Sequence, residues 1–359
     1  MTIYAELLAK LMSKDGVEVK ILSSRVKGKK KEEKEGKIKI TRSWVMLRLG
    51  KGLLMPFYIW DSFWEVKKAD VVNCHLPQLE SAIVALWALL LGKKLVITHH
   101  CEFGFDGTLS NRIIAGLSFP FHLFSYLTAN KIVSYTEDYA NKSIFLRMFR
   151  KKVVFVLPPI LIGKKREVEI EKIRRELKVG KAEKVVGYVG RIAWEKGLNF
   201  LIEAGEIIAK KRKLRIVLIG PYKDILGDKS VDKLRELIKK SKVRVDFLGA
   251  IEHDNLVSYY QNLDCLVLPS TNNLETFGIV QAEAMLCGCP VVASDLPGVR
   301  MPVKLTGLGK ISKIGSSRDL AKKIEMVLNK RYGEEQYRKA KELFDLKVFE
   351  ENYKEVLGI

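Results

Sequence analysis

Short apolar segments alternate with longer helical patterns along most of the chain. These segments are rich in Val, Ile and Leu and lack strict alternation, which is typical of strands buried on both faces of a sheet. The predicted strands are residues 17–22, 70–74, 94–98, 131–135, 153–157, 184–189, 215–219, 243–248, 265–269 and 290–294. The helical patterns between them indicate βαβ units, which predict parallel sheets in an α/β protein.

Two further stretches bear on the domain organisation. Residues 158–184 begin with two prolines and then become highly charged, which favours a domain boundary. We predict two Rossmann-like, doubly wound domains at 1–160 and 161–335, followed by C-terminal helices at 336–359. Residues 81–92 form the most apolar run; it is too short to span a bilayer and predicts a buried helix. Ligands of doubly wound folds bind beyond the carboxyl ends of the strands, so the loops there are where a site is expected.

The charge of the chain narrows the kinds of partner. There are 63 Lys and Arg residues against 42 Asp and Glu residues, a net charge of +21. Such an excess favours nucleic acid, acidic lipid headgroups or a phosphorylated ligand, unless it reflects a Lys-rich proteome. No nucleic-acid-binding motif is evident, so we expect no nucleic acid partner. The five cysteines form no C-x-x-C pair, which argues against disulfides and zinc and favours a reducing, cytoplasmic location.

The loop at 187–197 (GYVGRIAWEKG) has the residues to handle phosphate. Gly190 allows a tight turn, and Arg191 and Lys196 place two cations near a helix start, which suits a diphosphate. The alternative is a solvated basic turn. The chain has no G-x-x-x-x-G-K-[ST], no G-x-G-x-x-G after a strand and no Asp-x-Asp. We therefore expect no P-loop, no cofactor and no metal ion.

A second loop, in residues 274–290, holds two carboxylates. Glu275 precedes a predicted helix that begins near Phe277, and Glu283 lies about two turns into it. The free backbone amides of such a helix start could bind a phosphate, while carboxylates accept well from sugar hydroxyls. This order matches a nucleotide-diphosphate sugar. The alternative is that acidic residues favour a helix N-terminus and a solvated helix face.

Three segments together carry a resemblance to a known family. They are "GYVGRIAWEKGLNFLIEA", "FLGAIEHDNLVSYYQNLDCLVLPS" and "ETFGIVQAEAMLCGCPVVASDLPG". They resemble the C-terminal half of the family 4 retaining glycosyltransferases (glycosyl transferases group 1), which have the GT-B fold. "ADVVNCHLP", "KLVITHH" and "IVSYTEDYANKS" fit the N-terminal half more loosely. The resemblance implies two domains that face each other across a cleft and a last helix that crosses back to the first domain.

The resemblance also implies a diphosphate site. By analogy with the family, Arg191 and Lys196 would bind the donor diphosphate. The backbone amides around Phe277, Gly278 and Ile279 would share that task.

The resemblance implies further contacts to the donor. Glu275 would hold the hydroxyls of the donor sugar, Glu283 would hold the ribose, and Ile251 would lie beside the base through its backbone. One histidine should lie near the transferred sugar, and His100 is favoured over His99. The remaining histidines are expected to be ordinary polar or packing residues: His75, His122 and His253.

The implied reaction transfers a sugar from a nucleotide-diphosphate sugar with retention of configuration and without a metal ion. We expect a lipid-linked or carbohydrate acceptor. The alternatives are a nucleotide-sugar epimerase or a disaccharide phosphorylase on the same fold, or a non-catalytic nucleotide-sugar-binding protein.

The N-terminal region departs from the family pattern. Family members open with a strand and a glycine-rich loop, whereas this chain opens with a helical pattern that ends at Gly16. We hypothesise that the natural gene begins upstream and that a central strand is missing, which would leave unpaired ladder groups on its neighbours. Residues 25–64 run from basic to aromatic, which suits an anionic membrane surface and a peripheral location on the inner face of the cell membrane. The alternative is a solvated loop followed by a core helix.

Overall fold

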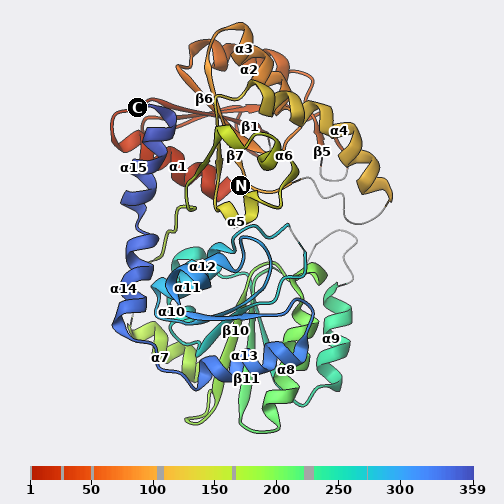
Figure 1. Ribbon diagram of the computed structural model, residues 1–359, viewed down its shortest axis with the longest axis vertical. Coiled ribbons are helices and arrows are strands. Elements are labelled where there is room, and N and C mark those ends of the chain that lie inside the picture. The colour runs from red at the N-terminus through yellow and green to blue at the C-terminus, as the bar shows by residue number, and fades with distance from the viewer. Residues whose placement is uncertain are drawn as a thin grey trace. The chain divides into compact units, whose positions relative to one another are not determined.

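The computed structural model describes residues 2–25, 28–49, 52–102, 109–163, 167–221, 230–272 and 274–359. The chain divides into two compact units (Figure 1). The first comprises Met1–Pro159 and Lys347–Ile359, and the second comprises Ile160–Leu346.

The second unit is built on a six-stranded parallel sheet. Its strand order is β12-β11-β10-β13-β14-β15. The strands are β10 (Lys184–Val189), β11 (Leu214–Ile219), β12 (Arg244–Gly249), β13 (Cys265–Leu268), β14 (Val291–Ser294) and β15 (Gly309–Ser312). Every residue of β11, β13 and β14 is buried, as expected for parallel strands covered on both faces.

Helices alternate with these strands and cover the sheet (Figure 1). They are α7 (Glu167–Glu176), α8 (Leu198–Ala209), α9 (Ser230–Lys240), α10 (Leu256–Tyr260), α11 (Ile279–Leu286), α12 (Met301–Thr306), α13 (Ser317–Leu328) and α14 (Glu334–Leu343). The short 3-10 helices η2 (Trp194–Lys196) and η3 (His253–Asn255) follow β10 and β12. α8 packs against α13, while α14 packs against α11 and α12. The structure therefore groups α14 with the second unit, which extends to Leu346, past the boundary predicted after residue 335.

The first unit contains separate sheets. A four-stranded parallel sheet has the order β6-β7-β8-β9, and a three-stranded sheet has the order β1-β3-β2. The strands are β1 (Val19–Ser24), β2 (Glu32–Glu35), β3 (Ile38–Ser43), β6 (Val71–Leu76), β7 (Lys94–His99), β8 (Lys131–Ser134) and β9 (Val153–Phe155). A hairpin of β4 (Leu47–Leu49) and β5 (Gly52–Leu54) stands apart. Among the residues that the structure describes, no strand pairing joins β1 to β6.

The helices of the first unit surround these sheets. They are α1 (Thr2–Lys14), α2 (Tyr58–Lys68), α3 (Ser81–Leu90), α4 (Leu109–Thr128), α5 (Glu137–Ala140), α6 (Ile144–Met148) and α15 (Leu346–Leu357), with the 3-10 helix η1 (Arg150–Lys152). The unit's core holds side chains of α2, α3, α4 and the parallel sheet, among them Val84, Ile97 and Tyr126.

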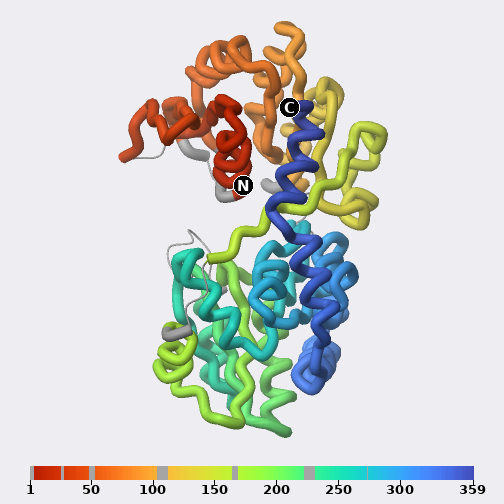
Figure 2. The backbone as a smooth tube through the Cα atoms, turned by 90° about the vertical axis from the view of Figure 1, so that its left-hand side faces the viewer, coloured from red at the N-terminus to blue at the C-terminus, as the bar shows by residue number. Residues whose placement is uncertain are grey.

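The C-terminal helix closes the first unit. Tyr353 of α15 is fully buried, and its hydroxyl accepts a hydrogen bond of 2.9 Å from Asn73 Nδ2 and contacts the Thr98 hydroxyl. Lys94 Nζ donates to the carbonyl oxygen of Leu357 at 2.7 Å. Figure 2 shows α15, in dark blue, beside the segments of the first unit. These contacts join residues more than 250 positions apart in the sequence.

Two interpretations for the first unit are wrong in part. The alternative for residues 25–64, a solvated loop followed by a core helix, fails in its first part, because this stretch contains the β2–β3 ladder, in which β2 (EEKE) is exposed throughout. The apolar run at 81–92 forms the predicted helix, but α3 is buried on one side only and exposes Leu86, Leu89 and Leu90 to solvent. Residues 26–27 and 50–51 of the basic and aromatic stretch lie outside the described residues.

Candidate functional site

Two glycines fix the loop that follows β10. Gly190 has φ +147°, and a Cβ there would lie 2.7 Å from the Tyr188 hydroxyl oxygen. Gly197 has φ +66°, and a Cβ there would lie 2.1 Å from the carbonyl oxygen of Pro269, in the loop after β13. Because β10 and β13 are parallel neighbours, their following loops meet at one edge of the sheet.

Both predicted cations of this loop contact carboxylates. Lys196 Nζ lies 2.6 Å from Glu275 Oε2, and these side chains are 20% and 18% exposed. Arg191 forms an ion pair with Glu195, and its carbonyl oxygen accepts a hydrogen bond of 2.9 Å from the Tyr188 hydroxyl. Burial raises the pKa of Tyr188, and the nearby Glu275 carboxylate raises that pKa further. The loop is therefore a compact cluster of paired charges at the carboxyl edge of the sheet.

The helix α11 begins beside this cluster. Gly278 caps it in the left-handed conformation, and a Cβ there would lie 2.3 Å from Leu268 Cδ2. The Phe277 ring is buried in the core, so that residue can offer only its backbone to a ligand. Within the described part of the chain, no acceptor is found for the amides of Gly278 and Ile279. These amides can therefore donate to an anion that binds at the helix start.

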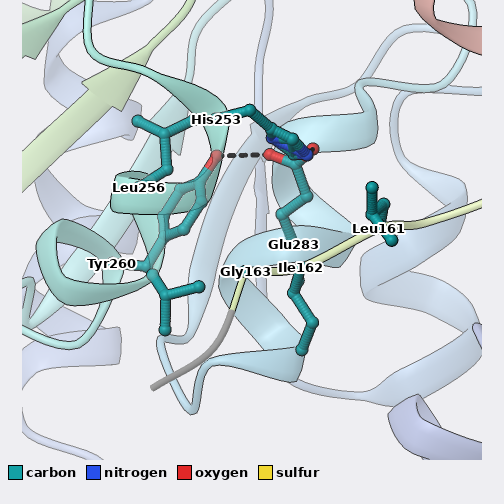
Figure 3. A pocket seen from close by; sticks show the side chains of 8 residues that line it. Leu161, Ile162, Gly163, His253, Leu256, Tyr260 and Glu283 are labelled. Carbon is teal, nitrogen blue, oxygen red and sulfur yellow. Dashed lines mark hydrogen bonds and ion pairs between the residues drawn. The ribbon is translucent and has the colours of Figure 1, made fainter. Parts of the chain in front are cut away.

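Glu283 lies farther along α11, in a separate small pocket (Figure 3). Its Oε2 accepts a hydrogen bond of 2.6 Å from the Tyr260 hydroxyl, and its Oε1 lies 3.8 Å from His253 Nε2. Both side chains point toward the carboxylate, and Leu161 and Ile162 also line the pocket. Burial raises the pKa of Glu283, whereas the Tyr260 hydroxyl lowers it in part.

Ile251 lies close in sequence to that pocket. It follows β12 and precedes His253, the first residue of η3, by two positions. The predicted donor-binding residues of the second unit therefore follow three strands of one sheet: β10 for Arg191 and Lys196, β12 for Ile251, and β13 for the rest.

The two candidate histidines belong to the first unit. His99 is 1% exposed, and its ring nitrogens contact the hydroxyls of Tyr126 and Tyr139. Burial, and then the charge of His122, lower the pKa of His99 to about 3.

His100 is nearly as enclosed, at 8% exposed. Its Nδ1 lies 2.5 Å from the Tyr135 hydroxyl, and its Nε2 lies 2.9 Å from His75 Nδ1. Burial, and then His75, lower the pKa of His100 to about 2, so the ring is neutral at pH 7. His75 thus contacts a candidate residue, although the sequence suggested only an ordinary polar role.

The sequence did not single out several side chains of these clusters. His253, expected to be an ordinary polar or packing residue, faces Glu283, and the Tyr260 hydroxyl donates a hydrogen bond to the same Glu283 carboxylate. Tyr188 and Glu195 flank Arg191. Only the closeness of His253 to Ile251 in the sequence could have suggested its place; the other contacts depend on how the strands are ordered.

Comparison with solved structures identifies the fold. The chain aligns with Anabaena HepE, solved in complex with UDP-glucose, with a TM-score of 0.70 and 20% identity over 89% of this chain and 85% of that one. This is the GT-B fold. A model described as Glycosyltransferase Family 4 matches residues 1–160, and one described as Glycosyl transferases group 1 matches residues 169–343. The chain belongs to the family 4 glycosyltransferases.

Curated relatives share parts of the sequence. An uncharacterized glycosyltransferase of Methanocaldococcus jannaschii is 38% identical over 133 residues, 36% of this chain and 32% of that protein. The 2-deoxystreptamine N-acetyl-D-glucosaminyltransferase of Streptomyces fradiae is 28% identical over 249 residues, 65% of this chain and 56% of that protein. The chain thus spans about one third and about one half of these two curated relatives.

Proposed function

We propose that the protein is a retaining glycosyltransferase that uses a nucleotide-diphosphate sugar and no metal ion. The observation that carries this proposal is the Lys196–Glu275 pair beside the start of α11. A cation and unpaired amides suit a diphosphate, and a carboxylate suits sugar hydroxyls. The three kinds of group lie together in one unit. HepE, which shares the fold, has been solved with UDP-glucose, and this supports a nucleotide sugar as the donor.

In the proposed reaction, the bond between the anomeric carbon and the diphosphate oxygen breaks. The acceptor oxygen bonds to that carbon on the same face, and the acceptor proton passes to the departing phosphate. Negative charge grows on the diphosphate as the bond breaks, and Lys196, Arg191 and the amides of Gly278 and Ile279 would stabilise it. Glu275 would orient the sugar through its hydroxyls.

We propose further contacts around this centre. Glu283 would hold the ribose, and the Ile251 backbone would lie beside the base. His100 would lie near the transferred sugar. The acceptor would be a lipid-linked sugar or a carbohydrate. The cysteine pattern supports a cytoplasmic enzyme, and the basic and aromatic stretch at 25–64 supports a location at the inner face of the cell membrane.

A matched pair of lysines tests the proposal. Lys184 begins β10, and Lys196 lies in the loop after the same strand. Each contacts a carboxylate, and Lys184 Nζ lies 2.7 Å from Asp264 Oδ1. Titration calorimetry with UDP, GDP and ADP, and then with their sugars, identifies the nucleotide that binds. Lys196→Met should weaken that binding by about tenfold to a hundredfold, as expected for a charged hydrogen bond, and Lys184→Met should leave it unchanged. Equal losses in the two variants would contradict the proposed site.

The reaction itself needs a separate measurement. Glu275→Gln should retain binding of the nucleotide diphosphate and lose sugar transfer, because the carboxamide keeps the shape but not the charge. Proton NMR of the first product formed by the parent enzyme should show the anomeric configuration of the donor. An inverted product would refute the retaining mechanism while leaving the donor site intact.

A further inference from the structure

Three neighbouring helices of the first unit expose large apolar side chains. Trp60 of α2 is 66% exposed, Leu90 of α3 is 65% exposed and Leu117 of α4 is 69% exposed. Isolated apolar residues at a surface are ordinary, but a contiguous set on adjacent helices marks an interaction site.

The exposed apolar residues lie opposite the buried side of each helix. In α2, Trp60 and Trp64 recur at i and i+4, opposite Tyr58, Ser62 and Val66, which are buried. The same spacing holds in α3 and α4. Leu86 and Leu90 lie opposite the buried Val84 and Ala88 of α3. Leu117 and Phe121 lie opposite the buried Ala115, Ser118 and His122 of α4.

The three helices form one layer (Figure 1). The Trp87 ring lies 5.2 Å from the Phe63 ring, and its Nε1 donates to the carbonyl oxygen of Ile59 at 3.1 Å, which joins α3 to α2. The hydroxyls of Ser81 and Ser125 lie 2.9 Å apart and join α3 to α4. We call the outward side of this layer, with Trp60, Trp64, Leu89, Leu90, Leu117 and Phe121, the α2–α3–α4 surface.

The charged residues of the layer indicate which kind of partner could bind the α2–α3–α4 surface. The sequence of α3 contains no charged residue, and that of α4 contains only Arg112. The two carboxylates of α2 are engaged with β3: Asp61 accepts from the Ser43 hydroxyl at 2.6 Å, and Glu65 accepts from the Thr41 hydroxyl at 3.3 Å.

The exposed charges of the layer are therefore cations. Lys67 and Lys68 are exposed at the end of α2, and Lys67 Nζ lies 5.3 Å from the Trp64 ring. A second copy placed symmetrically on this surface would bring the same cations together, while the carboxylates of α2 remain hydrogen-bonded to β3. An anionic lipid surface supplies what the layer lacks: hydrocarbon for the leucines, an interface for the tryptophans and negative charge for the lysines.

We propose that the α2–α3–α4 surface docks the protein on an anionic lipid bilayer. Among the residues that the structure describes, no helix is long and apolar enough to cross a membrane, so the helices would lie in the interface. The inference extends the proposed membrane location by naming the surface, and two of its three helices lie outside residues 25–64. Only the purpose of this docking, which is to bring the enzyme to a lipid-linked acceptor, rests on the proposed function.

Vesicle flotation tests the inference without requiring turnover. The whole protein should float with vesicles of phosphatidylcholine and phosphatidylglycerol and stay unbound with phosphatidylcholine alone. Trp60→Ser combined with Trp64→Ser should weaken binding by at least about tenfold, and removal of each lysine, Lys67→Ala or Lys68→Ala, should weaken it by about fivefold. Met326→Ser is the control, since Met326 is 40% exposed on α13 of the other unit.

Two parallel readouts separate the possible failures. Nucleotide binding and the thermal unfolding midpoint should be unchanged in every variant, which shows that lost flotation is not lost folding. Absence of flotation, or equal flotation of parent and tryptophan variant, would overturn the inference. A parent dimer in light scattering that becomes monomeric in the tryptophan variant, without flotation, would assign the surface to a second copy instead. Neither result would affect a donor site that still binds nucleotide.

Discussion

Replacing Tyr260 by Phe tests whether Glu283 is held as a buried carboxylate. The Tyr260 hydroxyl donates to Glu283 Oε2 at 2.6 Å, and Glu283 is only 7% exposed, so water cannot readily replace the lost donor. A hydrogen bond to a charged group contributes about 1.5–3 kcal/mol to stability. A loss of 2 kcal/mol would lower the unfolding midpoint of a unit of this size by about 4–8 °C.

The pH dependence of Tyr260→Phe has a definite sign. Burial raises the pKa of Glu283 above the ordinary value of a glutamate, so the stability linked to this group is lost as pH rises through the folded-state pKa. Tyr260 opposes that shift because it bonds to the carboxylate. Removing the Tyr260 hydroxyl raises the folded-state pKa of Glu283 further and increases the stability that is lost at high pH. The deficit of the variant should therefore be larger at pH 8 than at pH 5.

The neighbouring tyrosine supplies a matched control. Tyr259 is on the same helix and is partly exposed, and Tyr259→Phe removes the same hydroxyl without touching Glu283. Urea unfolding at pH 5 and pH 8, followed by circular dichroism, should show the loss only in Tyr260→Phe. An equal loss in both variants, or a deficit that does not change with pH, would refute the argument.

Three other variants test separate parts of the structure. Gly197→Ala should destabilise the second unit and abolish nucleotide binding because its Cβ would collide with Pro269, whereas Gly288→Ala, also at positive φ but in open space, should cost only about 1–2 kcal/mol; calorimetry that showed equal costs would contradict this. Tyr353→Phe should destabilise the first unit by about 1–3 kcal/mol because it leaves Asn73 Nδ2 without its acceptor, and urea unfolding with no change would show that the Tyr353 hydroxyl does not hold α15. In a double-mutant cycle of unfolding free energies, the Lys196→Met, Glu275→Gln double variant should be about 1–3 kcal/mol more stable than the sum of the two single losses predicts. All three variants should bind the donor sugar poorly. Additive losses of unfolding free energy would mean that the ion pair does not couple the two residues.

Buried parallel strands were the most predictable part of the fold. Residues 184–189 were predicted as a strand and form β10, and the prediction at 94–98 differs from β7 by one residue. Their apolar runs follow directly from burial on both faces of the sheet. The sequence of β2 shows no such apolar run, because its four residues are all charged and exposed; they are held by the ladder to β3 and by ion pairs to Lys10, Lys39 and Arg42. Likewise, the apolar composition of α3 could not reveal that one of its sides faces solvent.

The site residues were predictable by type but not by contact. Lys196 and Glu275 were each predicted for the donor, yet their ion pair joins positions 79 residues apart and depends on β10 lying beside β13. His253 was expected to be an ordinary polar or packing residue, and its acidic sequence neighbours, Glu252 and Asp254, did not mark it as a site residue. The carboxylate that it faces, Glu283, comes from another helix. Nonlocal contacts of this kind follow from strand order, which the sequence pattern does not specify.

The paired charges explain how the proposed site can be stable before a donor binds. Lys196 and Glu275 are each about four-fifths buried, so either would be costly to leave alone, and each satisfies the other at 2.6 Å. A diphosphate that reached Lys196 would offer a second anion to its ammonium group, which has three donor protons. The lysine would then bind Glu275 less strongly. Glu275 could then turn its oxygens to the hydroxyls of the sugar that the same diphosphate carries. Recognition of the phosphate and of the sugar would thus be coupled, since the first event supplies the anion that makes the carboxylate available for the second.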